Sequence, residues 1–129
     1  MRAIDTNVLA RYLLNDDKKQ SELAAATIAA GVFVPATVLL ELSWLLQSRY
    51  RQSREVVADT LAGIIDLPSV TVADAPLMRW VLSRYAAGAD IADMIHLASS
   101  TSTVGFATFD RAVVGDAGPG APVPVETLD

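Results

Sequence analysis

Short apolar segments alternate with segments of helical spacing along the whole chain, and this alternation most constrains how it can fold. The predicted strands are residues 2–5, 32–34, 70–72, 105–107 and 123–125. Short apolar strands separated by helices favour a mostly parallel sheet that is covered on both faces. We therefore predict an α/β fold, a three-layer α/β/α sandwich with a mostly parallel sheet of four to five short strands.

The helices between these strands are predicted from capping residues and hydrophobic spacing. Ser53, Asp74 and Asp90 stand where a helix N-cap belongs, and Asp17 with Gln20 resembles a capping box. Counted from cap to stop, the expected helices are residues 7–14, 17–30, 38–50, 53–67, 74–87, 90–99 and 110–114. The length of 129 residues predicts one domain over residues 1–129.

Composition narrows the kinds of chemical site that the chain can form. The chain has no cysteine and one histidine, His96, which excludes disulfides, cysteine-based zinc sites and zinc sites with two or more histidine ligands. The net charge is −5, and residues 66–129 carry all of it, with three basic and eight acidic residues. An acidic chain is a poor nucleic-acid binder by bulk attraction, unless carboxylates hold divalent cations that reverse the charge of a pocket.

The sequence predicts a cytoplasmic protein without a membrane segment. Its longest apolar run, residues 23–26, is far below the ~20 residues that cross a bilayer. Asp5 interrupts the first apolar stretch, so the pattern of a secretory signal is missing. Hydrophobic residues make up 52% of this short chain, which predicts helix surface left over for a homodimer interface or for the helix of a partner.

Four carboxylates each interrupt or end an apolar segment: Asp5, Glu41, Asp93 and Asp110. Sites in open α/β sheets form beyond the carboxyl ends of strands, where Asp5 and Asp110 stand. Carboxylates without histidine or cysteine suit Mg²⁺ or Mn²⁺. Two such ions can activate water and stabilise the leaving oxygen of a phosphodiester.

Each acid also has a structural interpretation. Asp5 and Asp110 are typical of turn formers or N-caps, and Asp90 of a helix N-cap. Glu41 can be neutralised by Arg49 or another arginine. Only the convergence of these acids on one place favours a metal site over these alternatives.

The motifs resemble those of PIN-domain nucleases, in order and spacing. They are Ile4-Asp-Thr-Asn-Val-Leu9, Glu41, Asp90-Ile-Ala-Asp-Met-Ile-His-Leu-Ala98 and Ala107-Thr-Phe-Asp110, and they span essentially the entire chain. The most similar subgroup is the small VapC-type toxins of toxin-antitoxin pairs. The resemblance implies an acidic pocket that binds Mg²⁺ or Mn²⁺ for RNA cleavage, and an antitoxin protein that blocks it.

Carried over to this sequence, the resemblance implies that Asp5, Glu41, Asp93 and Asp110 are the catalytic metal ligands. It also implies that Thr6, Asn7 and Thr108 are polar supporting residues, of which Asn7 and Thr108 orient the acids or metal-bound water. Asp90 matches a position that varies in the family. The remaining candidates have structural interpretations: His96 packed near the core, Trp44 and Trp80 in the core, and Arg49, Arg51 and Arg54 as a solvated basic turn.

Two alternatives from other classes remain open. One is a PIN-like RNA-maturation nuclease without an antitoxin. The other is a Mg²⁺-binding signalling module such as a response-regulator receiver, which needs a phosphoacceptor aspartate at the end of the third strand and a lysine after the fifth. The third strand leads only to Asp74, and no lysine follows Lys19, so this alternative is the weaker one.

Overall fold

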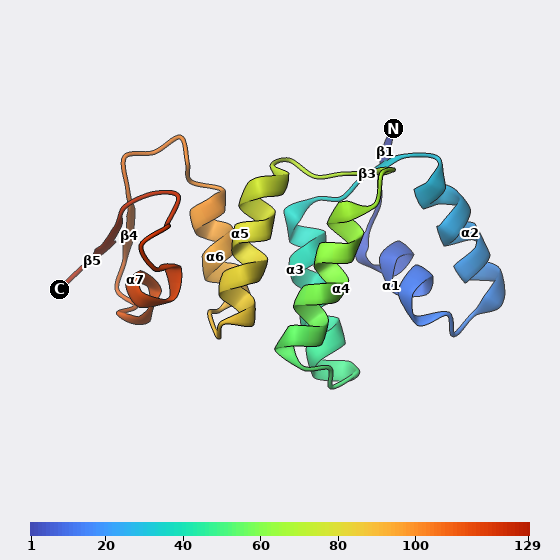
Figure 1. The fold of residues 1–129 in the computed structure, drawn as a ribbon, viewed down its shortest axis with the longest axis horizontal. Coiled ribbons are helices and arrows are strands. Elements are labelled where there is room, and N and C mark those ends of the chain that lie inside the picture. Colours follow the sequence, from blue (N-terminus) through green and yellow to red (C-terminus); the bar gives the residue numbers. More distant parts are fainter. The chain divides into compact units, whose positions relative to one another are not determined.

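The computed structural model describes all 129 residues, which divide into two compact units, Met1–Ala75 and Pro76–Asp129. Seven α-helices, one π-helix and five short strands make up the chain (Figure 1). Every strand pair is parallel, as the sequence predicts. None of the helices combines the length and the apolar character that crossing a bilayer requires.

The first unit contains a three-stranded sheet in the order β1-β2-β3. Its elements are β1 (Arg2–Ala3), α1 (Thr6–Leu14), α2 (Lys18–Ala29), β2 (Val32–Phe33), α3 (Ala36–Trp44), the π-helix η1 (Leu45–Arg49), α4 (Arg54–Asp66) and β3 (Val70–Thr71). Val32 in the central strand is in register with Arg2 on one side and Val70 on the other. The Ile4 N–H donates to the Phe33 carbonyl at 3.1 Å, so β-type pairing holds the chain up to Asp5.

Side-chain caps begin three of these helices, as the sequence predicts for Asp17 and Ser53 and as the structural interpretation of Asp5 expects. The carboxylates of Asp5 and Asp17 cap α1 and α2, and the Ser53 hydroxyl caps α4 by accepting the Val56 N–H at 3.2 Å. The chain leaves α2 through Gly31, whose φ of +97° suits glycine because it has no Cβ. These local rules explain why the predicted helix boundaries lie close to the observed ones.

The helix predicted over residues 38–50 differs from the structure. The α-helix α3 ends at Trp44, and the chain continues as η1 from Leu45 to Arg49. A π-helix fits an extra residue into the turn and shifts the side chains that follow it. Apolar spacing at three and four residues does not reveal this change, because it describes an α-helix only.

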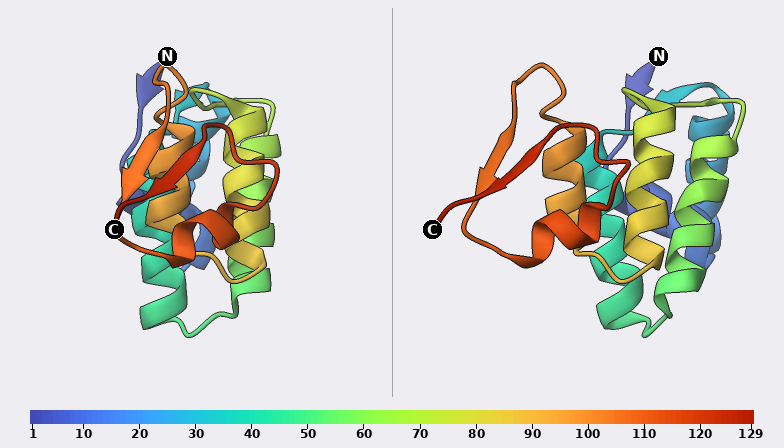
Figure 2. Two further views of the ribbon diagram at one scale, coloured as in Figure 1. Left: turned by 90° about the vertical axis from the view of Figure 1, so that its left-hand side faces the viewer. Right: turned by 60° about the vertical axis from the view of Figure 1, so that its left-hand side comes forward.

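The second unit is smaller and contains a two-stranded sheet (Figure 2). Its elements are α5 (Ala75–Ala86), α6 (Ile91–Ala98), β4 (Phe106–Thr108), α7 (Ala112–Ala117) and β5 (Val125–Thr127). Phe106 is in register with Val125 in the β4–β5 pair. The Arg84 guanidinium donates to the Asp116 carbonyl at 2.6 Å and so fastens α5 to α7. The last strand and α7 each lie about two residues later than predicted, because the Gly- and Pro-rich segment between them gives no periodic signal.

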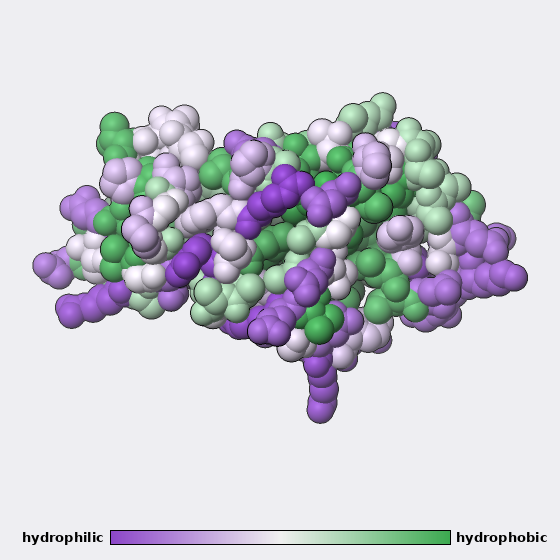
Figure 3. Space-filling view, viewed as in Figure 1, coloured by the Kyte–Doolittle hydropathy of each residue, from purple (hydrophilic) through white to green (hydrophobic).

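Apolar side chains are buried in both units, but some large ones remain exposed. Leu9, Leu42 and Leu61 are fully buried in the first unit, and Tyr85 and Leu97 are buried in the second. Green hydrophobic patches lie among purple polar side chains on the face drawn in Figure 3.

Trp44 is among the exposed residues, with 52% of its surface accessible. The prediction that Trp44 belongs to the core is therefore wrong, whereas Trp80 is half-buried.

Candidate metal-binding active site

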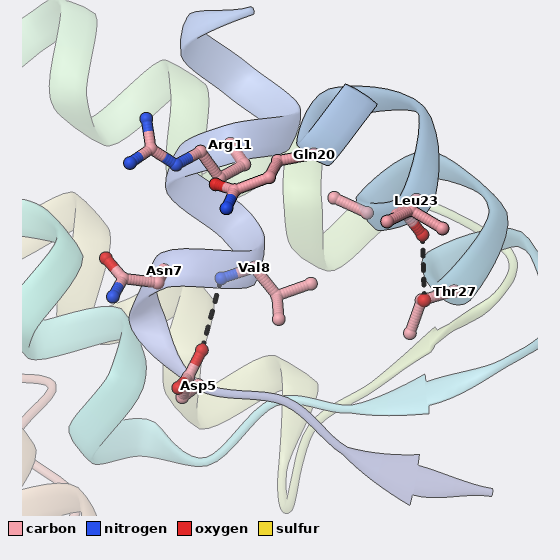
Figure 4. A pocket seen from close by; sticks show the side chains of 8 residues that line it. Asp5, Asn7, Val8, Arg11, Gln20, Leu23 and Thr27 are labelled. Carbon is pink, nitrogen blue, oxygen red and sulfur yellow. Dashed lines mark hydrogen bonds between the residues drawn. The ribbon is translucent and has the colours of Figure 1, made fainter. Parts of the chain in front are cut away.

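Asp5 stands at the junction between β1 and α1. Its Oδ1 accepts the Val8 N–H at 3.1 Å, as the dashed line in Figure 4 shows. This hydrogen bond fixes the carboxylate at the positive end of the α1 dipole, where a negative charge is favoured. The N-cap interpretation of Asp5 is thus confirmed, and Oδ2 remains available to another ligand.

Glu41 lies on the exposed side of α3. Leu39 and Leu42 anchor the opposite side of the helix in the core. The side that carries Glu41 continues through α3 into η1 with helical spacing, as Val38, Glu41, Trp44, Leu45 and Ser48. Glu41 itself is exposed, which explains how a carboxylate is tolerated within an apolar run.

Asp5 and Glu41 line the same pocket, a hollow of about 600 Å³. Its walls are Asp5, Thr6, Asn7, Val38, Glu41, Trp44, Leu45 and Ser48. None of these residues is basic, and neither Asp5 nor Glu41 forms an ion pair with an arginine or a lysine. The proposed partnership of Glu41 with Arg49 is therefore not found. Two carboxylates face one hollow with oxygen-bearing neighbours and no cation of the protein's own.

A second hollow of about 420 Å³ adjoins the first on the side of α2 (Figure 4). Asp5 and Asn7 line both hollows, whereas Arg11 lines only the second. The Arg11 guanidinium forms an ion pair with Asp16 at 2.9 Å. The basic side chain of α1 thus pairs with Asp16 and not with Asp5.

Asp90 and Asp93 share the first turn of α6 in the second unit. The Asp93 N–H donates to Asp90 Oδ1 at 2.9 Å, which confirms Asp90 as the N-cap. Partial burial of Asp93 raises the pKa of its carboxyl above the ordinary value, and the negative charges of Asp90 and Asp110 raise it further. His96 lowers this pKa, while Asp116 adds a smaller increase. Three aspartates of this unit, Asp90, Asp110 and Asp116, therefore raise the pKa of Asp93.

Asp110 follows β4 in a turn that its own side chain organises. Its Oδ1 accepts the Ala112 N–H at 2.9 Å, and its backbone N–H donates to Thr108 Oγ1 at 3.0 Å. The turn-forming interpretation of Asp110 is confirmed. Thr108, predicted to support the acids, holds the backbone of Asp110 in place.

His96 differs from its prediction. It lies in the last turn of α6 and is exposed, so the interpretation of a histidine packed near the core is wrong. The buried residues Ile91, Met94 and Leu97 form the apolar side of α6, and position 96 falls outside that stripe. Helical spacing alone was sufficient to find this.

The structure therefore places the predicted acids in two sets. Asp5 and Glu41 share a pocket in the first unit, together with Thr6 and Asn7. In the second unit, Asp90 and Asp110 act electrostatically on Asp93. Within either unit, no three acidic or histidine side chains are grouped closely enough to hold a metal ion.

Sequence reasoning missed Trp44 and Ser48 as pocket residues. Their spacing of three and seven residues from Glu41 was the signal that could have found them.

A family model for the PIN domain matches residues 3–113, and the chain therefore belongs to the PIN domain family. PIN domains are generally nucleases, and they typically use divalent metal ions. The match confirms the resemblance to PIN-domain nucleases and the predicted α/β/α fold class. No curated protein and no solved structure matches the chain significantly.

Proposed function

We propose that this protein is a metal-dependent ribonuclease that cleaves RNA phosphodiester bonds. The observation that carries the proposal is the pocket in which Asp5 and Glu41 face one hollow without a basic side chain. Membership in a family of nucleases supports the same conclusion. An acidic pocket repels a phosphodiester, so the pocket needs a cation before it can serve such a substrate.

The donors in the pocket fit Mg²⁺ or Mn²⁺. Carboxylate oxygens of Asp5 and Glu41, with the side-chain oxygens of Thr6 and Asn7 nearby, are the hard ligands that these ions prefer. When bound, such an ion supplies positive charge and Lewis acidity at the phosphate. The Val8 N–H orients Asp5 for this role by holding one carboxylate oxygen.

The second unit supplies the other two proposed ligands, Asp93 and Asp110. The pocket of the first unit is lined by two carboxylates, those of Asp5 and Glu41. The assignment of Asp93 and Asp110 rests on the order and spacing of the motifs, which resemble those of PIN-domain nucleases. Asp90 and Thr108 act as supports, since Asp90 holds the backbone of Asp93 and Thr108 holds that of Asp110.

The biological role we propose is that of the toxin in a type II toxin-antitoxin system, acting in the cytoplasm. The order and spacing of the motifs support this role through their resemblance to VapC-type toxins. The proposed partners are an RNA substrate, a cognate antitoxin protein and a second copy of the chain. The alternative is an RNA-maturation nuclease without an antitoxin, and growth of a host that expresses the protein distinguishes the two roles.

RNA cleavage by the purified protein tests the catalytic proposal. Wild type should cut RNA in Mg²⁺ or Mn²⁺ and stop in excess EDTA, and Asp5→Asn should be inactive. Asp17→Asn is the matched control, because Asp17 caps α2 as Asp5 caps α1 but lines neither hollow beside Asp5. Equal cleavage in EDTA contradicts the proposal.

Growth of a bacterial host tests the toxin role. Expression of wild type without a partner should arrest growth, and Asp93→Asn should not. An active but harmless wild type, with no short reading frame beside its gene, favours the maturation nuclease instead.

A further inference from the structure

Trp44 is a large aromatic residue that the fold leaves exposed. Its accessible fraction is 52%, whereas the neighbouring Leu42 and Leu46 are buried. The ring lines the pocket of Asp5 and Glu41. Among the exposed large hydrophobic residues, Trp44 is the one that lines this pocket.

Trp44 follows Glu41 by three residues, a rise of about 4.5 Å along an α-helix. Ser48 comes next on the same side, and the exposed Arg49 and Arg51 follow at the end of η1. Along the chain the order is thus carboxylate, aromatic ring, hydroxyl and basic residues. Aromatic and basic residues together are typical of sites for single-stranded nucleic acid, since bases stack on aromatic rings and phosphates contact cations.

The backbone at Trp44 is held where α3 becomes η1. The Ser48 hydroxyl donates to the Trp44 carbonyl, and Leu45 directly after it begins the π-helix. π-helical turns within helices are frequent at functional sites, because the extra residue redirects side chains. Buried Leu42 and Leu46 on either side anchor the segment, so the ring projects from a fixed base.

The surroundings of the ring favour a nucleic acid over a second protein. An apolar protein surface seated on Trp44 would also desolvate Asp5 and Glu41, which lie in the same pocket without cationic partners, so a protein that covers this pocket must bring cations of its own. An RNA strand keeps its phosphates hydrated or paired with cations while one base covers the ring.

We propose that Trp44 is the stacking platform for a base of the RNA substrate, next to the bond that is cleaved. This inference rests on the proposed ribonuclease function. Trp44 then contributes to substrate binding and to the choice of cleavage position, and the carboxylates perform the chemistry.

Tryptophan fluorescence tests the inference, because the chain has only two tryptophans. The measurement uses the full chain with Asp93→Asn to prevent cleavage, Mg²⁺, and a short single-stranded RNA of mixed sequence. With Trp80→Phe added, Trp44 is the only emitter, and RNA should quench it. With Trp44→Phe added instead, the remaining Trp80 should show little change.

Affinity and kinetics give independent readouts. Trp44→Ala should bind the same RNA about tenfold more weakly, which corresponds to about 1.4 kcal/mol and lies within the range of one base–aromatic stack. Trp44→Phe keeps a ring and should retain most of the affinity. In the active background, Trp44→Ala should raise KM about tenfold with kcat within about twofold, and should alter the pattern of cut positions. Val56→Ala removes another exposed apolar side chain, on α4, and should change neither the affinity for RNA nor the kinetics of cleavage.

The outcomes separate this inference from the function on which it rests. RNA that binds and is cleaved, without quenching of Trp44 and with unchanged KM in Trp44→Ala, overturns the stacking role and leaves the ribonuclease intact. Loss of a dimer in Trp44→Ala with unchanged RNA affinity also overturns it, and assigns the ring to a contact between copies. Wild type that neither binds nor cleaves RNA in Mg²⁺ or Mn²⁺ overturns both proposals.

Discussion

The acids of the two units stand in different surroundings. In the first unit, Asp5 and Glu41 are exposed in one pocket, and each comes from a separate element. In the second unit, Asp93 is half-buried, and both burial and neighbouring aspartates raise the pKa of its carboxyl. The difference teaches that a carboxylate can stand open to solvent in one place, and in another be partly buried among like charges that raise its pKa.

The largest expected effect is on catalysis. Glu41→Gln and Asp93→Asn should each lower the rate of RNA cleavage by about 10³-fold, because a metal ligand supports several kcal/mol of transition-state stabilisation. Single-turnover cleavage in saturating Mg²⁺ measures the rate. Glu55→Gln, an acid in the first turn of α4, is the control and should retain full activity. A large loss of cleavage rate in one of these two variants and none in the other would show that the two sets of acids do not act together.

Metal-induced stabilisation has the next largest expected effect. Mn²⁺ at a hundred times its Kd should stabilise the folded wild type by about 2.7 kcal/mol. Asp5→Asn and Asp93→Asn should gain much less, since each removes a ligand. Melting curves with and without Mn²⁺ measure the shift. An undiminished shift in one variant would remove its residue from the metal site.

The capping role of Asp5 predicts a smaller effect that no metal alters. In EDTA, Asp5→Ala should lose about 1 kcal/mol of unfolding free energy, because the Val8 N–H loses its acceptor, while Asp5→Asn should lose almost none. Urea denaturation of both variants measures the difference. Asp17→Ala should behave like Asp5→Ala in stability but keep its RNA cleavage. Equal stability of all three variants and wild type would show that these caps contribute little.

The smallest expected effect concerns pH and Asp93. Folding raises the pKa of the Asp93 carboxyl. At pH values just above the ordinary pKa of an aspartate, the native state therefore binds more protons than the unfolded state does. Stability contributed by the protonated form is present below this ordinary pKa and is lost as pH rises through the folded pKa. In EDTA, Asp93→Asn should therefore be more stable than wild type at pH 7, by roughly 0.2–0.5 kcal/mol as for one like-charge helix pair, and this gain should vanish in acid. Stability curves that run parallel from pH 3 to pH 7 would contradict this.

Local features were predictable from the sequence, and features set by packing were not. The caps at Asp5, Ser53 and Asp90 depend on hydrogen bonds that span three residues, so their signal is complete in a short window. The apolar run around Glu41 marked an unusual carboxylate, and the strand-end rule marked Asp5. That the two line one pocket depends on how α1 and α3 pack against each other, which no short window contains.

The misjudged residues share a physical cause. Trp44 has apolar neighbours in sequence, yet it lies on the exposed side of its helix. The π-helix after it could not be seen in α-helical spacing. His96 falls outside the apolar stripe of α6, and its place could have been calculated from the buried positions.

Asp5 is both the N-cap of α1 and a proposed metal ligand, and this double role has a genetic consequence. Asparagine caps a helix as well as aspartate does, and a single-nucleotide change converts the codon of one into that of the other. The position therefore permits a mutation that removes the proposed ligand while the hydrogen bond from the Val8 N–H can persist. Under the proposed toxin role, such a mutation should yield a chain that folds, persists and does no harm, so selection for survivors should enrich Asp5→Asn above substitutions that unfold the chain.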